Sequence, residues 1–190
     1  MWFLEASAPA LVLGSAQPDT SIDRGACERA GVEVVRRRSG GGAVLLEPGE
    51  ALWVDVIVPA GDPLWDRDVG RASHWLGAVW LAALADSGRA GAAVHRGALV
   101  RTEWSSVICF AGLGPGEVTV GGRKVVGISQ RRTRDAARFQ CVALSVWDPA
   151  PIAALCAPPR PTAAELAPVA AGVGVPWPDL AAAFLANLPA

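Results

Sequence analysis

The sequence predicts an α+β fold with a mixed, largely antiparallel sheet and flanking helices. Short apolar runs bounded by glycine or proline recur over residues 10–58 and again over 94–147, which is typical of strands. Between these groups, residues 64–86 place apolar side chains at three- and four-residue spacing, which indicates one long helix. Runs of strands around a single long helix favour the α+β class.

The first group of runs predicts four strands and one short helix. Gly31 stands where a glycine commonly ends a helix, and Asp19 or Thr20 is suited to cap the start of that helix. Pro59 ends the last strand because proline has no backbone N–H to donate to a sheet. The expected strands are 10–14, 32–35, 43–46 and 51–58, and the expected helix is 21–30.

The second group begins after the long helix, which Gly88 is placed to close. Residues 117–127 have the form of a hairpin with Gly121-Gly122 as a two-residue turn, so Lys124 is expected opposite Thr119. The other expected elements are strand-like pieces at Val94 and 106–110, a last strand at 139–147, and helices at 162–170 and 178–188.

Bulk composition predicts one cytoplasmic, globular domain over residues 1–190. The chain is 52% apolar with a net charge of −1, so it has no overall attraction for nucleic acid or for an acidic membrane. No apolar run approaches the roughly 20 residues that span a bilayer, and the start lacks the pattern of a signal peptide. The four cysteines form no CxxC pair and only two histidines occur, so no metal site is expected.

The most informative stretch is Arg36-Arg37-Arg38-Ser39-Gly40-Gly41-Gly42-Ala43-Val44, between two expected strands. Arginine side chains carry forked, permanently charged donors that suit phosphate or carboxylate. Consecutive glycines lack Cβ atoms, so a ligand can approach the backbone closely. This combination predicts a loop that holds an anion.

A second stretch, Gly121-Gly122-Arg123-Lys124-Val125-Val126-Gly127, places a lysine early in a hairpin strand. The glycine three residues later leaves room beside that lysine. Alone, such a lysine is most often a solvated surface residue. This lysine becomes a candidate site residue because the same sequence also contains the arginine–glycine loop.

Together these stretches resemble the lipoate–protein ligase A and octanoyltransferase family, whose catalytic domain fold is shared with biotin–protein ligases. The RRxSGGGAV pattern of that family is matched by residues 36–44, and its GRKxxGSAQ-like segment by residues 122–130. Residues 12–17, Val-Leu-Gly-Ser-Ala-Gln, resemble the vLGrsQ stretch upstream. The order and the spacing of the three motifs agree with the family.

The resemblance implies a biotin/lipoate ligase-like catalytic domain with a tunnel for an eight-carbon acyl chain. It implies that Lys124 is the essential catalytic cation and that Arg37 clamps a nucleotide phosphate. A preplaced ammonium can stabilise the negative charge that builds on a carbonyl oxygen under attack. The residues implied to bind an acyl-adenylate are Arg37, Ser39, Gly40, Gly41, Gly42, Ala43, Val44 and Gly127.

The first function implied is a ligase that uses ATP with Mg²⁺ to attach lipoate or octanoate to a protein lysine. Its partners would be the lipoyl carrier domains of 2-oxoacid dehydrogenases or the glycine cleavage H-protein. The separate C-terminal accessory domain of ATP-using ligases has no counterpart in the 190 residues. Residues 140–142 are Gln-Cys-Val, where the family commonly has HHG or QHG.

Two alternatives stay open. An octanoyltransferase would take its acyl group from acyl carrier protein and pass it through a cysteine thioester, with Cys156 as the candidate nucleophile. Cys109, expected in an apolar strand, and Cys141 are interpreted as structural. The second alternative is a non-catalytic paralogue that binds an acyl group or a nucleotide.

Overall fold

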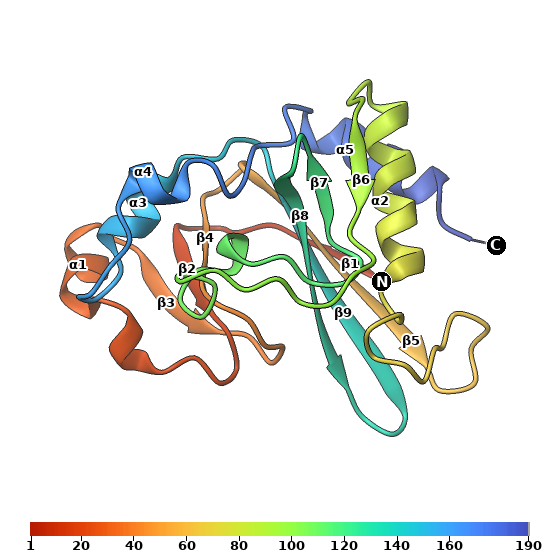
Figure 1. Cartoon of the computed structure of the whole chain (residues 1–190), viewed down its shortest axis with the longest axis horizontal. Helices are drawn as coiled ribbons and strands as arrows, with labels where there is room; N and C mark the ends of the chain where they lie inside the picture. Colours follow the sequence, from red (N-terminus) through yellow and green to blue (C-terminus); the bar gives the residue numbers. More distant parts are fainter. Residues whose placement is uncertain (190) are drawn as a thin grey trace.

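The computed structural model describes residues 1–189, so Ala190, the last residue of the predicted domain, lies outside the described part. A six-stranded sheet has the order β1-β5-β9-β8-β7-β6 with every neighbouring pair antiparallel. A three-stranded sheet, β3-β2-β4, lies beside it (Figure 1) and combines one parallel with one antiparallel pair. The predicted α+β fold with a mixed, largely antiparallel sheet is confirmed.

The strands agree closely with the expected ones in the first half of the chain. The large sheet contains β1 (Trp2–Leu4), β5 (Ala51–Pro59), β6 (Ala92–Val94), β7 (Val118–Val120), β8 (Arg123–Arg132) and β9 (Ala136–Leu144). The small sheet contains β2 (Ala10–Leu13), β3 (Glu33–Arg36) and β4 (Val44–Leu46). The edge strand β1 was not predicted, because its three exposed residues become a strand only by pairing with β5.

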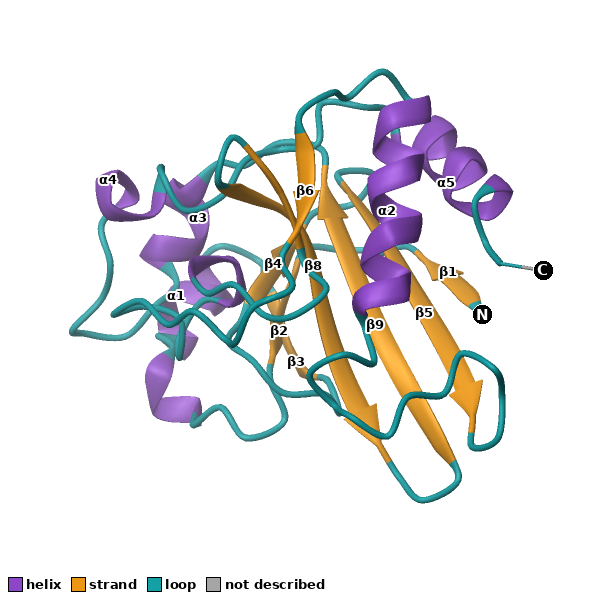
Figure 2. Ribbon diagram, turned by 45° about the vertical axis from the view of Figure 1, so that its right-hand side comes forward, coloured by secondary structure: helices purple, strands orange, loops and turns teal. Residues whose placement is uncertain are grey.

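Within residues 1–189, five α-helices cover the two sheets. They are α1 (Arg24–Arg29), α2 (His74–Asp86), α3 (Pro149–Ala154), α4 (Ala163–Leu166) and α5 (Trp177–Ala186). In Figure 2, α2 and α5 lie together over the large sheet, whereas α1, α3 and α4 gather near the small sheet. No helix within the described residues is long and apolar enough to cross a membrane.

The predicted helix over 64–86 is wrong in its first ten residues. Asp62, Asp66 and Asp68 each accept a hydrogen bond at 2.8 Å from the backbone N–H two residues further on. These local turns satisfy the backbone without a helix and compete with it. The helix therefore starts only at His74, after the last of these turns.

The hairpin prediction is confirmed in its register. Val120 pairs with Arg123 and Thr119 with Lys124, while both turn glycines have positive φ, 58° for Gly121 and 76° for Gly122. The next strand was predicted too late in the chain: β9 starts at Ala136 because Thr133 N–H bonds the Ala136 carbonyl and closes the β8–β9 turn.

Two apolar layers cover opposite faces of the large sheet. On one face, Phe139 and Cys141 of β9 join a core with α2 and α5, in which Trp80 and Phe184 have ring centroids 4.5 Å apart. On the other face, Val142 and Leu144 of β9 join a core with the small sheet. The arginine–glycine loop therefore lies where the two sheets meet.

Candidate active site

The loop between β3 and β4 packs backbone against backbone on both of its sides. A Cβ atom on Gly14 would lie 1.8 Å from the Gly41 carbonyl oxygen, and one on Gly42 would lie 2.6 Å from the Ile108 nitrogen. Gly41 also has a φ of 97°, which side chains rarely adopt. The glycines in this loop serve close packing as well as any approach of a ligand.

Gly42→Ala is therefore expected to lower the free energy of unfolding by about 1–3 kcal/mol, since its methyl group would press on backbone atoms that cannot rotate away. Gly40→Ala is the matched control, because a Cβ there meets no atom within 4 Å. Urea unfolding of both variants gives the comparison. Equal stability of the two variants would contradict this account of the loop.

Arg37 is buried and holds the loop in shape. Its guanidinium donates to the carbonyl oxygens of Val12 at 3.0 Å, Gly40 at 2.7 Å and Gly42 at 2.9 Å. It does not line the cavity that contains Lys124. This geometry does not favour the expected phosphate clamp, since both terminal nitrogens donate to backbone carbonyls and the guanidinium is buried away from that cavity.

The segment before the hairpin is bound to the end of the loop. The Ala43 N–H donates to the Val107 carbonyl at 2.7 Å, and the Cys109 N–H donates to the Ala43 carbonyl at 2.9 Å. The strand predicted over 106–110 is wrong: the chain turns on itself, with the Ile108 N–H bonding the Trp104 carbonyl, and Cys109–Ala111 forms a short 3₁₀ helix. This turn directs Cys109 to the cavity instead of into a sheet.

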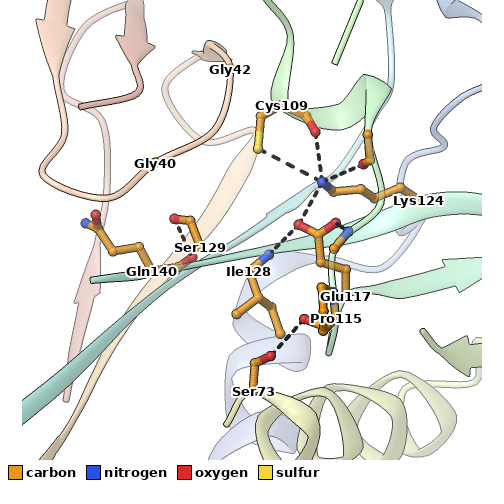
Figure 3. Close-up of polar contacts among 12 residues, drawn as sticks. Gly40, Gly42, Ser73, Cys109, Pro115, Glu117, Lys124, Ile128, Ser129 and Gln140 are labelled. Carbon is orange, nitrogen blue, oxygen red and sulfur yellow. Dashed lines mark hydrogen bonds and ion pairs between the residues drawn. The ribbon is translucent and has the colours of Figure 1, made fainter. Parts of the chain in front are cut away.

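Lys124 lies at the centre of the site (Figure 3), and 97% of its surface is buried. Its ammonium donates to the carbonyl oxygens of Cys109 at 2.9 Å and Gly112 at 3.1 Å. It forms an ion pair with Glu117 at 2.8 Å, and the Cys109 Sγ lies 4.0 Å away. The Nζ atom is also 5.1 Å from the centre of the Phe110 ring.

Glu117 is the buried counter-ion of this lysine. Its two carboxylate oxygens also accept hydrogen bonds from the backbone N–H groups of Gly114 at 2.6 Å and Ile128 at 2.9 Å. These bonds fix the carboxylate beside the Lys124 ammonium. The charge of Lys124 is therefore held in place by rigid backbone.

The environment of Lys124 favours its charged form. Burial by itself lowers the pKa of Lys124, but the negative charges of a Cys109 thiolate and of Glu117 outweigh burial and raise the pKa above its ordinary value. The contribution of this ammonium to stability is therefore complete below the pKa of an unfolded lysine. It is lost only as the pH rises through the higher folded value.

These groups face a cavity of about 500 Å³. Gly127 keeps room for the lysine: a Cβ there would lie 3.2 Å from the Lys124 Cε atom. The cavity is lined by Gly40, Gly41, Gly42, Arg101, Cys109, Glu117, Lys124 and Ser129, among others. The three glycines and Lys124 line this one cavity, whereas the buried loop residues Ser39, Ala43 and Val44 do not line it.

The cysteines differ sharply in their surroundings. Cys156 is 2% exposed, donates its thiol to the Ile152 carbonyl, and has a pKa raised to about 11 by burial. Cys141 is fully buried, and burial raises its pKa to about 12. Cys109 alone among the four lines the cavity with Lys124. The structure therefore does not support Cys156 as the nucleophile. The strand expected around Cys109 is wrong, because Cys109 begins a 3₁₀ helix, and its partly buried side chain packs against the core.

Sequence reasoning gave no role to several polar cavity residues besides Cys109, among them Arg101, Glu117 and Ser129. The hairpin pattern contained one usable signal, since an acidic residue just before β7 lies close to the start of β8 once the hairpin closes. Arg101 lies in an irregular segment that no pattern places near the loop. Ser129 lies within the matched segment 122–130, and alternation along the strand puts it on the same face as Gly127, which was already a candidate.

A family model described as the lipoyl protein ligase A/B catalytic domain matches residues 1–173. The octanoyltransferase LipM of Clostridioides difficile (strain 630) is 28% identical over 114 residues, which cover 60% of this chain and 41% of that protein. The octanoyltransferase LipM of Carboxydothermus hydrogenoformans is 34% identical over 128 residues, 67% of this chain and 46% of that protein. The chain thus spans less than half the length of these two relatives.

Two solved structures share the fold. Each is 17% identical in sequence and aligns with 97% of this chain. The lipoate protein ligase from Thermoplasma acidophilum, described as bipartite and studied with its E2 lipoyl domain, superposes with a TM-score of 0.74 over 68% of its own chain. A lipoate-protein ligase A bound with ATP superposes with a TM-score of 0.69 over 69% of its chain. Taken with the match over residues 1–173, the chain belongs to the lipoyl protein ligase A/B catalytic domain family.

Proposed function

We propose that this protein transfers an octanoyl or lipoyl group from a thioester donor to a lysine of a lipoyl carrier domain, through a thioester on Cys109. The observation that carries the proposal is the position of Cys109, whose sulfur lies in the cavity 4.0 Å from the Lys124 ammonium. A cation beside the sulfur can stabilise the negative charge that the sulfur carries as a thioester forms and breaks. The two octanoyltransferase relatives support the same reaction class.

The chemistry balances in two steps. The Cys109 thiolate attacks the acyl carbonyl of the thioester donor. The thiolate of the donor leaves, and the acyl group is held as a Cys109 thioester. A neutral lysine amine of the carrier domain then attacks that carbonyl, the Cys109 thiolate leaves, and the amine proton is released. The three N–H groups of Lys124 already donate to the Cys109 and Gly112 carbonyls and to Glu117. In both steps its positive charge therefore stabilises, through its electric field, the negative charge on the acyl oxygen and on the attacking or departing sulfur.

An apolar cleft beside the site offers a place for the acyl chain. A cavity of about 250 Å³ is lined by Val44, Phe110, Leu144 and Trp147, among others, and the Phe110 and Trp147 rings stack with centroids 5.5 Å apart. Phe110 follows Cys109 directly and also contacts the Lys124 ammonium. In this proposal, the acyl chain of the Cys109 thioester lies in this cleft, beside Phe110.

The second candidate is an ATP-dependent ligase, which the fold shared with two ligases favours. Arg101 supplies an exposed cation on the cavity that could meet a phosphate. Two observations make this reaction the weaker candidate. The donors of Arg37 face loop carbonyls, and Glu117, the one carboxylate among the described residues that line the cavity, is bound to Lys124 and two backbone amides. This carboxylate fits a magnesium nucleotide poorly, because its oxygens are already taken.

Loading of a purified lipoyl domain from two donors distinguishes the candidates. Octanoyl-acyl carrier protein without ATP is expected to give an octanoylated lipoyl domain and, when the lipoyl domain is left out, one octanoyl group on the enzyme that hydroxylamine removes. Loading that requires lipoate, ATP and magnesium, with no acyl group on the enzyme, would instead show a ligase. Binding of octanoate without loading from either donor would show a non-catalytic paralogue.

The lipoyl-domain and acyl carrier protein partners, and the location in the cytoplasm, belong to this proposal. The Thermoplasma neighbour, a ligase studied with its E2 lipoyl domain, supports the first partner. Capture of the acylated enzyme by either purified partner tests the two partner assignments separately from the chemistry.

A further inference from the structure

A buried chain of polar side chains runs from the large sheet to the cavity, and the reaction proposed above does not use it. It starts at Asp55 on β5, passes through Gln140 on β9 and Ser39 of the arginine–glycine loop, and ends at Ser129 on β8. Asp55 is fully buried, and Ser39 is 1% exposed. Buried polar groups are retained only when their partners are fixed, so the direction of each hydrogen bond in this chain is informative.

The Asp55 carboxylate sets the direction at the buried end. It forms an ion pair with Arg138, whose Nε atom donates at 2.8 Å, and it accepts a hydrogen bond from the Trp53 indole at 2.8 Å. An ionised carboxylate can only accept, so the Gln140 amide must turn its NH₂ group toward Asp55, at 3.3 Å. The carbonyl oxygen of Gln140 therefore faces Ser39.

Each remaining bond follows from this orientation. The Gln140 oxygen needs a donor, so the Ser39 hydroxyl gives its single proton to it at 2.7 Å. Ser39 Oγ is then left as an acceptor, and the Ser129 hydroxyl gives its own proton to it at 2.8 Å. Ser129 Oγ consequently keeps lone pairs and no free proton. Because Ser129 lines the cavity, those lone pairs are available to a bound molecule.

The position of Ser129 relative to the reacting groups is set by strand geometry. Gly127 and Ser129 share one face of β8, and a Cβ on Gly127 would point at the Lys124 side chain. Two residues along a strand span roughly 7 Å between their Cα atoms. Ser129 is therefore about 7 Å further along β8 than Gly127, on the side away from Lys124. This gap can hold a carbonyl carbon beside Lys124 and Cys109, followed by an attacking nitrogen next to Ser129.

We propose that Ser129 Oγ accepts a hydrogen bond from the attacking lysine amine of the carrier domain and orients its lone pair toward the acyl carbonyl. This inference rests on the proposed acyl transfer through Cys109 and assigns a positioning residue to its second step. The amine has N–H groups to donate, and Ser129 offers only acceptance. A group that donates at this position would instead compete for the lone pair of the amine.

The test separates the two half-reactions with the full chain. Ser129→Ala is expected to form the Cys109 acyl-enzyme at the wild-type rate, but to transfer it to the lipoyl-domain lysine roughly three- to tenfold more slowly, the loss of about one neutral hydrogen bond. Transfer of the same acyl group to 2-mercaptoethanol, which has no N–H, is expected to be unchanged. Ser129→Thr keeps the hydroxyl and is expected to restore transfer to lysine.

Gln140→Met provides a second, nearly isosteric break in the chain, and it is expected to show the same selective loss for the amine acceptor. Equal slowing of both acceptors in Ser129→Ala, or no slowing of either, would overturn the assignment while leaving the proposed function intact. Slower acyl-enzyme formation with unchanged lysine transfer would place the Ser129 contact on an N–H of the donor instead, and would also overturn it. Failure of the wild-type enzyme to form any acyl-enzyme would count against the proposed function itself.

Discussion

Cys109→Ser is expected to lower octanoyl transfer to the lipoyl domain by roughly a thousandfold or more, because a serine hydroxyl without a base is a poor nucleophile. The protein should stay folded, since Cys109 is only partly buried and a serine oxygen occupies less space than sulfur. The measurement is acyl-enzyme formation by intact-protein mass, together with the rate of lipoyl-domain loading. Both should disappear together.

Cys156→Ser is the matched control for this loss. That side chain is buried against the Ile152 carbonyl, to which a serine hydroxyl can still donate. Transfer is therefore expected at close to the wild-type rate. Should Cys156→Ser abolish the acyl-enzyme while Cys109→Ser retains it, the nucleophile assigned here is wrong.

Lys124→Met is expected to reduce transfer by roughly a hundred- to a thousandfold, the usual cost of removing one oxyanion donor from a preorganised site. It should also lower the free energy of unfolding by about 3–5 kcal/mol, because Glu117 is left buried without its counter-ion. Activity and stability therefore fall together in this variant, and activity alone does not separate a catalytic role from a structural one.

The double variant Lys124→Met with Glu117→Gln separates the two effects. Removal of both charges should recover much of the lost stability, since no uncompensated ion remains. Transfer should stay as low as in the single variant. Thermal unfolding and loading assays on the same preparations give the comparison, and near-normal transfer by the stabilised double variant would rule out the proposed role of the ammonium.

Local patterns were sufficient for most strands and for the motifs. The Gly121-Gly122 turn could be placed because two-residue turns impose one register on their strands, and this register put Lys124 opposite Thr119. Errors arose where side chains or distant partners overrode a pattern. The aspartates before α2 replaced helical hydrogen bonds with local turns, and β1 exists only through its pairing with β5.

By itself, the sequence determined the fold class, the position of the glycine loop between two strands, the register of the lysine hairpin and the resemblance to one family, because each of these follows from residues near one another in the chain. The tertiary structure alone decided what the charged and reactive side chains do. Arg37 bonds carbonyls of its own loop and of β2, Lys124 is matched with Glu117, and the cavity receives Cys109 instead of Cys156. Such roles depend on which donors, acceptors and charges meet after folding, and residue type does not specify a partner.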